Sequence, residues 1–211
     1  MLVEVNFESE SHQDRFAISI LKNKRNGFFV ELGSASPKFS NNTFFMELYL
    51  GWHGIMVEMD PKYEASYKEI RHNSVHVMKN ALDIDYKELF KKHNVPKNID
   101  YLQVDLDVNN NSTLELLYKL EKEVMDEYKF ACITFETDHY LDRNNTKEIS
   151  REIFKRHGYE LVFCIKVPNT DKEFEDWYCF PNLVDMELVN KVKMKSFDKP
   201  IDGRLINYDV D

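Results

Sequence analysis

Short apolar runs typical of buried strands alternate five times with amphipathic segments typical of helices between residues 28 and 157. Strands separated by helices pair in parallel, because the chain must cross the sheet again before each new strand. The predicted strands are 28–32, 54–58, 74–78, 99–105 and 130–136. The helices that follow them are predicted at 42–50, 63–71, 85–93, 112–128 and 146–157, and a further helix at 11–22 precedes the first strand.

Two more strands are predicted after the last helix, at 159–167 and 177–180, with no helix between them. Residues 168–172 are long enough to join them as an antiparallel hairpin. The sequence therefore predicts an α/β Rossmann-like fold, a three-layer α/β/α sandwich whose seven-stranded sheet is mostly parallel with one antiparallel strand near its edge. We expect a single domain over residues 1–211, with an N-terminal helical segment at 1–26 and a polar tail at 198–211.

Charge and composition narrow the possible partners. The 211 residues include 28 Lys and Arg against 37 Asp and Glu, a net charge of −9. This disfavours a nucleic-acid backbone or an anionic membrane as the main partner. No apolar run approaches the ~20 residues of a membrane helix, and the N-terminus does not have the pattern of a signal peptide. We expect a cytoplasmic protein that acts on a small molecule.

The three cysteines, Cys132, Cys164 and Cys179, are odd in number and widely spaced. Their pattern predicts buried thiols in a reducing compartment rather than disulfides or a zinc site.

Acidic residues gather where the predicted strands end. In open parallel sheets, ligands bind at the carboxyl ends of the strands, so these side chains are candidates for a site. A single such residue is usually a helix cap or a solvated loop charge, but four strands agree here. The residues are Glu31, Glu58, Asp105, Asp107, Glu136 and Asp138.

The turn after the first strand suits a ligand that has no phosphates. Gly33 permits a tight turn, but Ala35 and Lys38 stand where a dinucleotide-binding turn has its second and third glycines. Glu58, 25 residues after Gly33, can accept two hydrogen bonds from a ribose diol. The alternative for Glu58 is a cap of the next helix, a role for which Asp60 competes.

Several of these motifs resemble one known family. Residues 29–34 read Phe-Val-Glu-Leu-Gly-Ser, residues 40–43 read Ser-Asn-Asn-Thr, and residues 51–58 read Gly-Trp-His-Gly-Ile-Met-Val-Glu. Together with later blocks at 99–107, 133–139 and 175–177, they resemble the FkbM-like class I S-adenosylmethionine-dependent methyltransferases. The chain departs from that pattern at Ala35, where the family often has glycine, and at Asp107-Val108, where it often has Glu-Gly.

The resemblance implies that S-adenosylmethionine is the cofactor. Glu31 and Gly33 would then line its methionine end, Glu58 would hold the ribose, and Ala81 and Leu82 would enclose the adenine. An acidic pocket also suits a cofactor with a cationic sulfonium. The further cofactor contacts that we expect are Ser34, Ala35, Asn42, Thr43, Met59 and Asp105.

Transfer of the methyl group to a hydroxyl would require a base, a metal ion or both, because a neutral hydroxyl has a pKa far above 7. Asp105, Asp107, Glu136 and Asp138 could supply oxygen ligands to Mg²⁺. His139 could be the base, with Asp105 as the second catalytic residue. The alternative for His139 is a loop residue with local hydrogen bonds. We therefore expect O-methylation of a sugar or glycan hydroxyl, with Mg²⁺ as a candidate second cofactor.

Two other functions stay open from the sequence. Asp105-Leu106-Asp107 is an Asp-x-Asp motif at a strand end, as in metal-dependent nucleotide-sugar glycosyltransferases. Alternatively, the chain is a methyltransferase-like domain that binds a ligand without catalysis. Trp177 could stack on an acceptor sugar or could be buried at the start of its strand.

Overall fold

The computed structural model describes residues 7–141, 144–167 and 169–196. The strands are β1 Phe28–Leu32, β2 His53–Glu58, β3 Val75–Met78, β4 Asn98–Val104, β5 Lys129–Glu136, β6 Glu160–Lys166 and β7 Glu173–Cys179. The helices are α1 Gln13–Ile20, α2 Phe44–Leu50, α3 Glu64–Ile70, α4 Tyr86–Lys92, α5 Ser112–Glu123, α6 Thr146–Arg156 and α7 Met186–Ser196. Two short 3₁₀ helices, η1 Pro61–Tyr63 and η2 Ala81–Asp83, follow β2 and β3.

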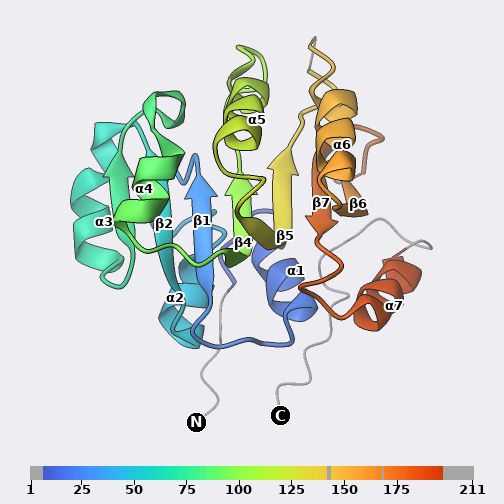
Figure 1. Ribbon diagram of the computed structural model, residues 1–211, viewed down its shortest axis with the longest axis horizontal. Helices are drawn as coiled ribbons and strands as arrows, with labels where there is room; N and C mark the ends of the chain where they lie inside the picture. The colour runs from blue at the N-terminus through green and yellow to red at the C-terminus, as the bar shows by residue number, and fades with distance from the viewer. Residues whose placement is uncertain (1–6, 142–143, 168, 197–211) are drawn as a thin grey trace.

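All seven strands form one sheet in the order β3-β2-β1-β4-β5-β7-β6 (Figure 1). β1 to β5 pair in parallel, whereas β7 runs antiparallel to both β5 and β6. The predicted fold class, a mostly parallel seven-stranded sheet with one antiparallel strand near the edge, is confirmed.

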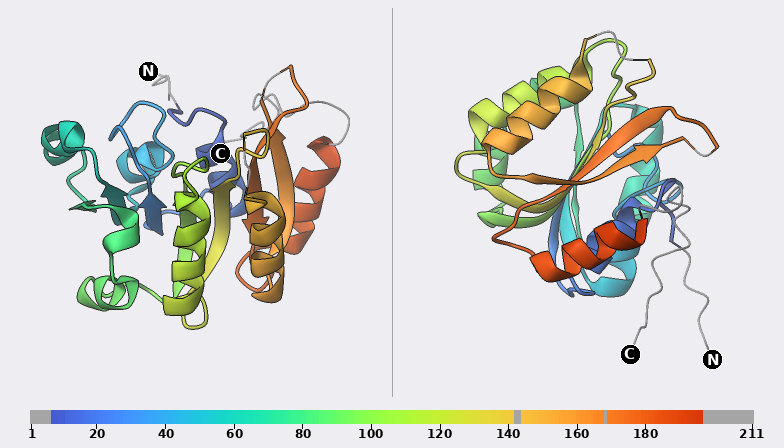
Figure 2. Two further views of the ribbon diagram at one scale, coloured as in Figure 1. Left: turned by 90° about the horizontal axis from the view of Figure 1, so that it is seen from above. Right: turned by 90° about the vertical axis from the view of Figure 1, so that its right-hand side faces the viewer.

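Helices cover both faces of the sheet, as the right-hand view of Figure 2 shows. One hydrophobic cluster joins the sheet to α4, α5 and α6 through side chains such as Phe90, Leu117 and Phe154. A second cluster on the other face includes Phe16 of α1 and Met46 of α2. Because both faces are covered, β1 is buried over its whole length, as central parallel strands usually are.

The Gly-Trp-His-Gly block after α2 has a structural explanation. Gly51 ends α2 with a positive φ of 68°, a conformation that glycine adopts without strain. Trp52 is fully buried and donates its indole N–H to the carbonyl of Lys24 at 2.7 Å. This block therefore anchors the entry into β2.

Two element boundaries differ clearly from the sequence prediction. α5 ends at Glu123 rather than at residue 128, because the chain turns at Val124 while Val124 and Tyr128 stay buried and so continue the apolar pattern. β7 begins at Glu173 rather than at Trp177, because its acidic residues pair with a strand on each side.

α7 was not predicted from the sequence; it packs against β6. The predicted tail at 198–211 and the first six residues of the predicted N-terminal segment lie outside the described residues.

The three cysteines are free. Cys132 and Cys179 are buried, as predicted, whereas Cys164 is half-buried. No helix in the described part of the chain is long and apolar enough to cross a membrane.

Candidate active site

The order of the sheet reverses at β1. From β1 the chain continues to β2 on one side and later returns to β4 on the other side. The connections that leave β1 and β4 diverge at this point, which creates the crevice where open α/β sheets bind ligands. The carboxyl ends of β1, β4 and β5, which flank this switch point, lie at the upper edge of the sheet in Figure 1.

Gly33 makes the close approach of β1 and β4 possible. Its φ is +81°, and a Cβ atom built on it would lie 1.8 Å from the backbone oxygen of Asp105. The backbone N–H groups of Gly33 and Ser34 donate to the carbonyl of Val57 at 3.0 and 3.1 Å. No other residue fits this turn without displacing the end of β4.

Glu31 holds the loop that begins α2. Its carboxylate is 1 % exposed and accepts hydrogen bonds from the Asn41 amide, the Asn42 backbone N–H and the Thr43 hydroxyl. Burial raises the pKa of Glu31, and the positive charge of Arg71 opposes that rise. In this structure Glu31 holds the loop that carries Asn42 and Thr43, both of which are buried.

Arg71 fixes the same loop from α3. Its buried guanidinium donates to Glu47 at 2.9 Å, to the Pro37 carbonyl at 3.1 Å, and to Asn41 and Thr43 at 2.8 Å each. Sequence analysis missed this residue, because its role depends on contacts between elements that lie far apart in the chain.

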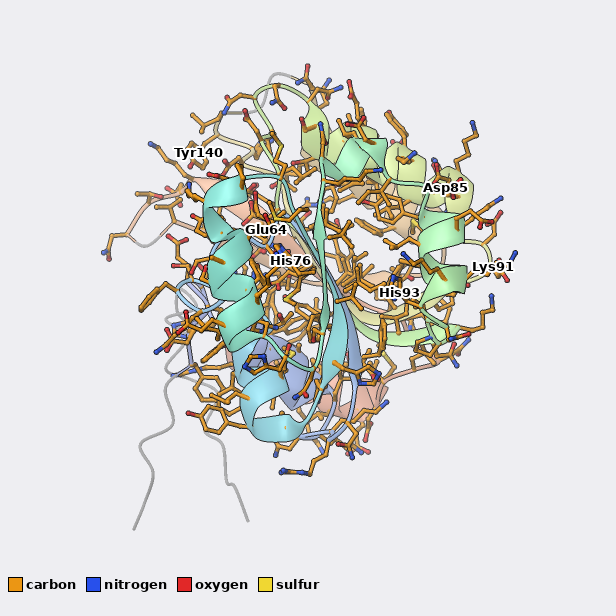
Figure 3. All side chains as sticks on the ribbon, turned by 90° about the vertical axis from the view of Figure 1, so that its left-hand side faces the viewer. Glu64, His76, Asp85, Lys91, His93 and Tyr140 are labelled. Atoms are coloured by element: carbon orange, nitrogen blue, oxygen red, sulfur yellow. The ribbon has the colours of Figure 1, made fainter. Side chains whose placement is uncertain are left out.

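Tyr67 of α3 adds a second support. Its hydroxyl donates to the Ser34 hydroxyl at 2.6 Å, and its ring stacks on His76 of β3 with centroids 3.7 Å apart. In Figure 3, His76 lies next to Glu64, which places α3 directly against the edge strand. The turn after β1 is thereby tied to α3.

Glu58 bridges the first two turns of the site. One carboxylate oxygen accepts the N–H of Ala35 at 2.8 Å and the other accepts the N–H of Asp60 at 2.7 Å. Asp60 also caps η1 through the N–H of Lys62, so Glu58 is not the helix cap. Met59 beside it is 65 % exposed.

Ala81 and Leu82 form η2 at the end of β3. Ala81 is buried, and its carbonyl accepts the hydroxyl of Tyr86 at 3.0 Å. Leu82 is half-buried against the same cluster.

Three carboxyl groups form a row on the other side of the crevice. Val104 pairs with Phe135, so Asp105 and Glu136 follow at neighbouring strand ends. Glu136 in turn pairs directly with Glu175 across β5 and β7. We call Asp105, Glu136 and Glu175 the acidic row. Glu175 belongs to the 175–177 block, but the sequence does not predict it as a site residue. Only the antiparallel register of β5 and β7 brings it beside Glu136.

The carboxyl groups of the acidic row all have raised pKa values. Burial raises the pKa of Glu136, and the neighbouring Asp105, which hydrogen-bonds with it, raises it further. Asp105 keeps an exposed surface, yet protein atoms crowd its carboxyl group and raise its pKa as well. Burial raises the pKa of Glu175 to about 8, against the lowering effect of the hydrogen bond from Trp177.

The predicted Mg²⁺ site is not supported. Within residues 7–141, 144–167 and 169–196, no group of three or more His, Cys, Asp or Glu side chains could hold a metal ion. The reason lies in the predicted ligands themselves. Asp107 accepts the N–H of Asn109 in its own loop, Asp138 bonds with Tyr140, and Asp105 shares a hydrogen bond with Glu136.

The loop after β5 carries the remaining predicted residue. His139 is exposed there. Tyr140 next to it is 41 % exposed and lies at the upper edge of the molecule in Figure 3. Both residues border the acidic row rather than joining it.

Trp177 is buried, so the alternative of stacking on an acceptor sugar is wrong. It is 1 % exposed, stacks on Phe16 with centroids 4.7 Å apart, and donates its indole N–H to Glu175 at 2.6 Å.

A cavity of about 450 Å³ opens at the opposite edge of the sheet, where the strands begin. Its lining includes His53, His93 and Asp100, and Figure 3 labels His93 at the C-terminal end of α4. None of the predicted site residues lines it. We place the site at the crevice instead, because ligands of such sheets bind at the carboxyl ends of the strands.

Comparison with solved structures identifies the fold as that of class I methyltransferases. An S-adenosylmethionine-dependent methyltransferase from Clostridium acetobutylicum matches with a TM-score of 0.53 and 10 % identity over 85 % of this chain and 94 % of its own. A candidate O-methyltransferase from Klebsiella pneumoniae matches with 0.53 and 11 % over 82 % and 81 %. A candidate rRNA methylase from Clostridium thermocellum matches with 0.51 and 11 % over 82 % and 97 %.

Sequence comparisons with family models and with curated proteins found no match. The chain therefore has the class I methyltransferase fold, and the closer resemblance to the FkbM-like family stays a prediction.

Proposed function

We propose that this chain is an S-adenosylmethionine-dependent methyltransferase, similar to the FkbM-like family, that methylates a hydroxyl group of a sugar or glycan. The observation that carries the proposal is the placing of the Gly33 turn between Glu58 and Asp105 at the switch point of the sheet. The fold alone does not select the acceptor, since its matches are named for different acceptor classes.

The residues at the crevice fit the cofactor. Glu58 offers a carboxylate to the ribose diol, and the exposed Met59 offers an apolar surface to the adenine. The buried side-chain oxygen of Asn42 has no hydrogen-bond partner, so it can accept from the ammonium group at the methionine end. When bound, S-adenosylmethionine supplies an electrophilic methyl group and leaves as a neutral thioether.

The acidic row supplies the base. With S-adenosylmethionine bound, attack of the acceptor oxygen on the methyl carbon would displace the sulfur, and the Asp105–Glu136 carboxyl pair would take the hydroxyl proton. A base works best when its pKa lies near the working pH, and burial raises the pKa of Asp105 from its ordinary acidic value in that direction. His139, exposed on the next loop, is the second candidate for this role.

Calorimetric titration with S-adenosylhomocysteine tests the proposal. We expect micromolar binding by the wild type, roughly ten- to hundredfold weaker binding by Glu58→Gln, since a charged hydrogen bond is lost, and unchanged binding by Asp105→Asn. Asp105→Asn should instead abolish methyl transfer. Binding of uridine diphosphate with Mg²⁺ in place of S-adenosylhomocysteine would replace the proposal with the glycosyltransferase. Tight binding without turnover on any acceptor would favour the inactive binding domain.

A further inference from the structure

Among the described residues, none of the charges that act most strongly on the acidic row is basic. Buried carboxylates elsewhere in the chain are paired: Asp176 binds Arg151 through two bonds of 2.7 and 2.8 Å, and Glu47 binds Arg71 at 2.9 Å. By contrast, the charges that act most strongly on Glu136 are those of Asp105, Asp138 and Glu175. A buried carboxyl group without a positive partner has a raised pKa and is held in its neutral form, so a cation that a ligand brings to the row would favour the charged form.

One carboxylate oxygen of Glu175 remains available to bind a cation. Glu175 is 3 % exposed, and its two hydrogen bonds, from the Gln13 amide at 3.1 Å and the Trp177 indole at 2.6 Å, both end on Oε2. Its Oε1 takes no part in them.

An independent observation comes from Gln103 on β4. Its side chain is 2 % exposed, and its Oε1 is buried with no hydrogen-bond partner. Gln103 precedes Asp105 by two positions, so both side chains stand on the same face of the sheet. Its register partners are Glu31 and Thr134.

Both register partners of Gln103 direct their hydrogen bonds elsewhere. Glu31 bonds with the loop of residues 41–43, and Thr134 bonds with the hydroxyl of Tyr101. Gln103 therefore shares its face of the sheet with Asp105 of the acidic row, and neither register partner satisfies its side-chain oxygen. The side-chain oxygen of Gln103 is thus a further acceptor without an N–H donor.

We propose that the methyl acceptor carries a protonated primary amine beside its reactive hydroxyl, as an amino sugar does, and that Glu136, Glu175 and Gln103 bind this ammonium group. This inference rests on the proposed function, because it names the substrate class of the same site. A compact ammonium has three N–H donors, which match two carboxylates and one amide oxygen. A neutral sugar would bring no positive charge to the carboxyl groups of the acidic row.

The positive charges of S-adenosylmethionine would lie too far from Glu175 to pair with its carboxyl group. They belong at the β1 and β4 side of the crevice, beside Gly33. Neighbouring strands lie ~4.8 Å apart, so β7 is about 10 Å beyond β4 and about 14 Å from β1. Lys172, the basic residue near the next loop, has its ammonium 5.2 Å from the centre of the Tyr140 ring. Glu175 is therefore free to act on the acceptor.

The test compares matched sugars that differ in charge. Glucosamine, N-acetylglucosamine and glucose are titrated into the wild-type chain saturated with S-adenosylhomocysteine, and the same sugars are used in methyl-transfer assays. We expect the amine to bind at least roughly tenfold tighter than either neutral sugar, as expected for a charged hydrogen bond. Equal binding of the three sugars, or no binding of glucosamine, overturns the inference.

Glu175→Gln tests the residue. Its amide oxygen can still accept from Gln13 and Trp177, so the fold should persist, and thermal unfolding checks this. We expect the preference for the amine to disappear while S-adenosylhomocysteine binds as before. Glu173→Gln is the matched control on the same strand, because Glu173 is paired with Lys147, and it should keep the preference. A preference that survives in Glu175→Gln contradicts the proposal.

The two levels of proposal can fail separately. If S-adenosylhomocysteine does not bind, the proposed function fails, and titration of the three sugars into the chain alone still measures whether the row selects an amine. If the cofactor product binds and the sugars are not distinguished by charge, only the substrate class is wrong.

Discussion

Arg71→Met should uncouple the loop of residues 41–43 from the rest of the fold. The methionine fills much of the same space but has no donors. The change removes the cation that faces the buried Glu47 and the donors to Pro37, Asn41 and Thr43. The substitution therefore acts on stability and on the loop next to the crevice together.

The expected loss of stability follows from the contacts. Removing one partner of a buried ion pair costs about 3–5 kcal/mol. Glu47 keeps the Asn73 N–H and the Ser74 hydroxyl as donors, so we expect the lower end, about 3 kcal/mol. Folded domains are stable by about 5–15 kcal/mol, so the variant should still fold. With a urea m-value of about 2 kcal/mol/M, the unfolding midpoint should fall by about 1.5 M.

Urea unfolding followed by the fluorescence of the buried Trp52 and Trp177 measures this loss. Calorimetry with S-adenosylhomocysteine should show weaker binding under conditions where the variant is folded. Arg25→Met is the control, since Arg25 is exposed and should change stability by no more than about 0.5 kcal/mol.

The double variant Glu47→Gln with Arg71→Met tests the cause. Once Arg71 is gone, neutralising Glu47 should cost little or restore stability, because the uncompensated charge is removed. A loss below about 1 kcal/mol for Arg71→Met, or strict additivity of the two changes, would refute the reasoning.

Three further predictions concern single residues. Gly33→Ala places a Cβ 1.8 Å from the Asp105 carbonyl at a φ of +81°. It should lower the free energy of unfolding by at least about 2 kcal/mol, measured in urea, and abolish S-adenosylhomocysteine binding. Near-wild-type stability would contradict the close approach of β1 and β4. Met59→Ser should leave stability within about 0.5 kcal/mol but weaken S-adenosylhomocysteine binding; equal affinity would remove Met59 from the adenine site. Because the folded pKa of Glu175 is raised from 4.5 to about 8, its protonated form stabilises the fold below pH 4.5 and this contribution is lost as the pH rises to about 8. Glu175→Gln should therefore be more stable than the wild type at pH 9, and equal pH profiles of unfolding would refute the shift.

Much of the architecture follows from local sequence patterns. The alternation of apolar runs and amphipathic segments predicts all seven strands and six of the seven α-helices, because burial on two faces of a sheet and on one face of a helix leaves different periodicities. The same patterns place Gly33, Glu58 and Asp105 at strand ends, where a parallel sheet gathers them at one edge. The start of β7 was missed because its acidic residues do not have the apolar composition of a buried strand.

Other features depend on contacts between distant segments. The antiparallel register of β5 and β7 sets Glu175 opposite Glu136, and a shift of one residue would turn Glu175 to the other face. Arg71 holds the loop of residues 41–43 only because α3 packs beside that loop. Local sequence patterns predict that Gly33, Glu58 and Asp105 reach the carboxyl edge of the sheet. The tertiary structure decided which of them share a hydrogen bond, a proton or a buried charge, since these interactions depend on distances that no local pattern encodes.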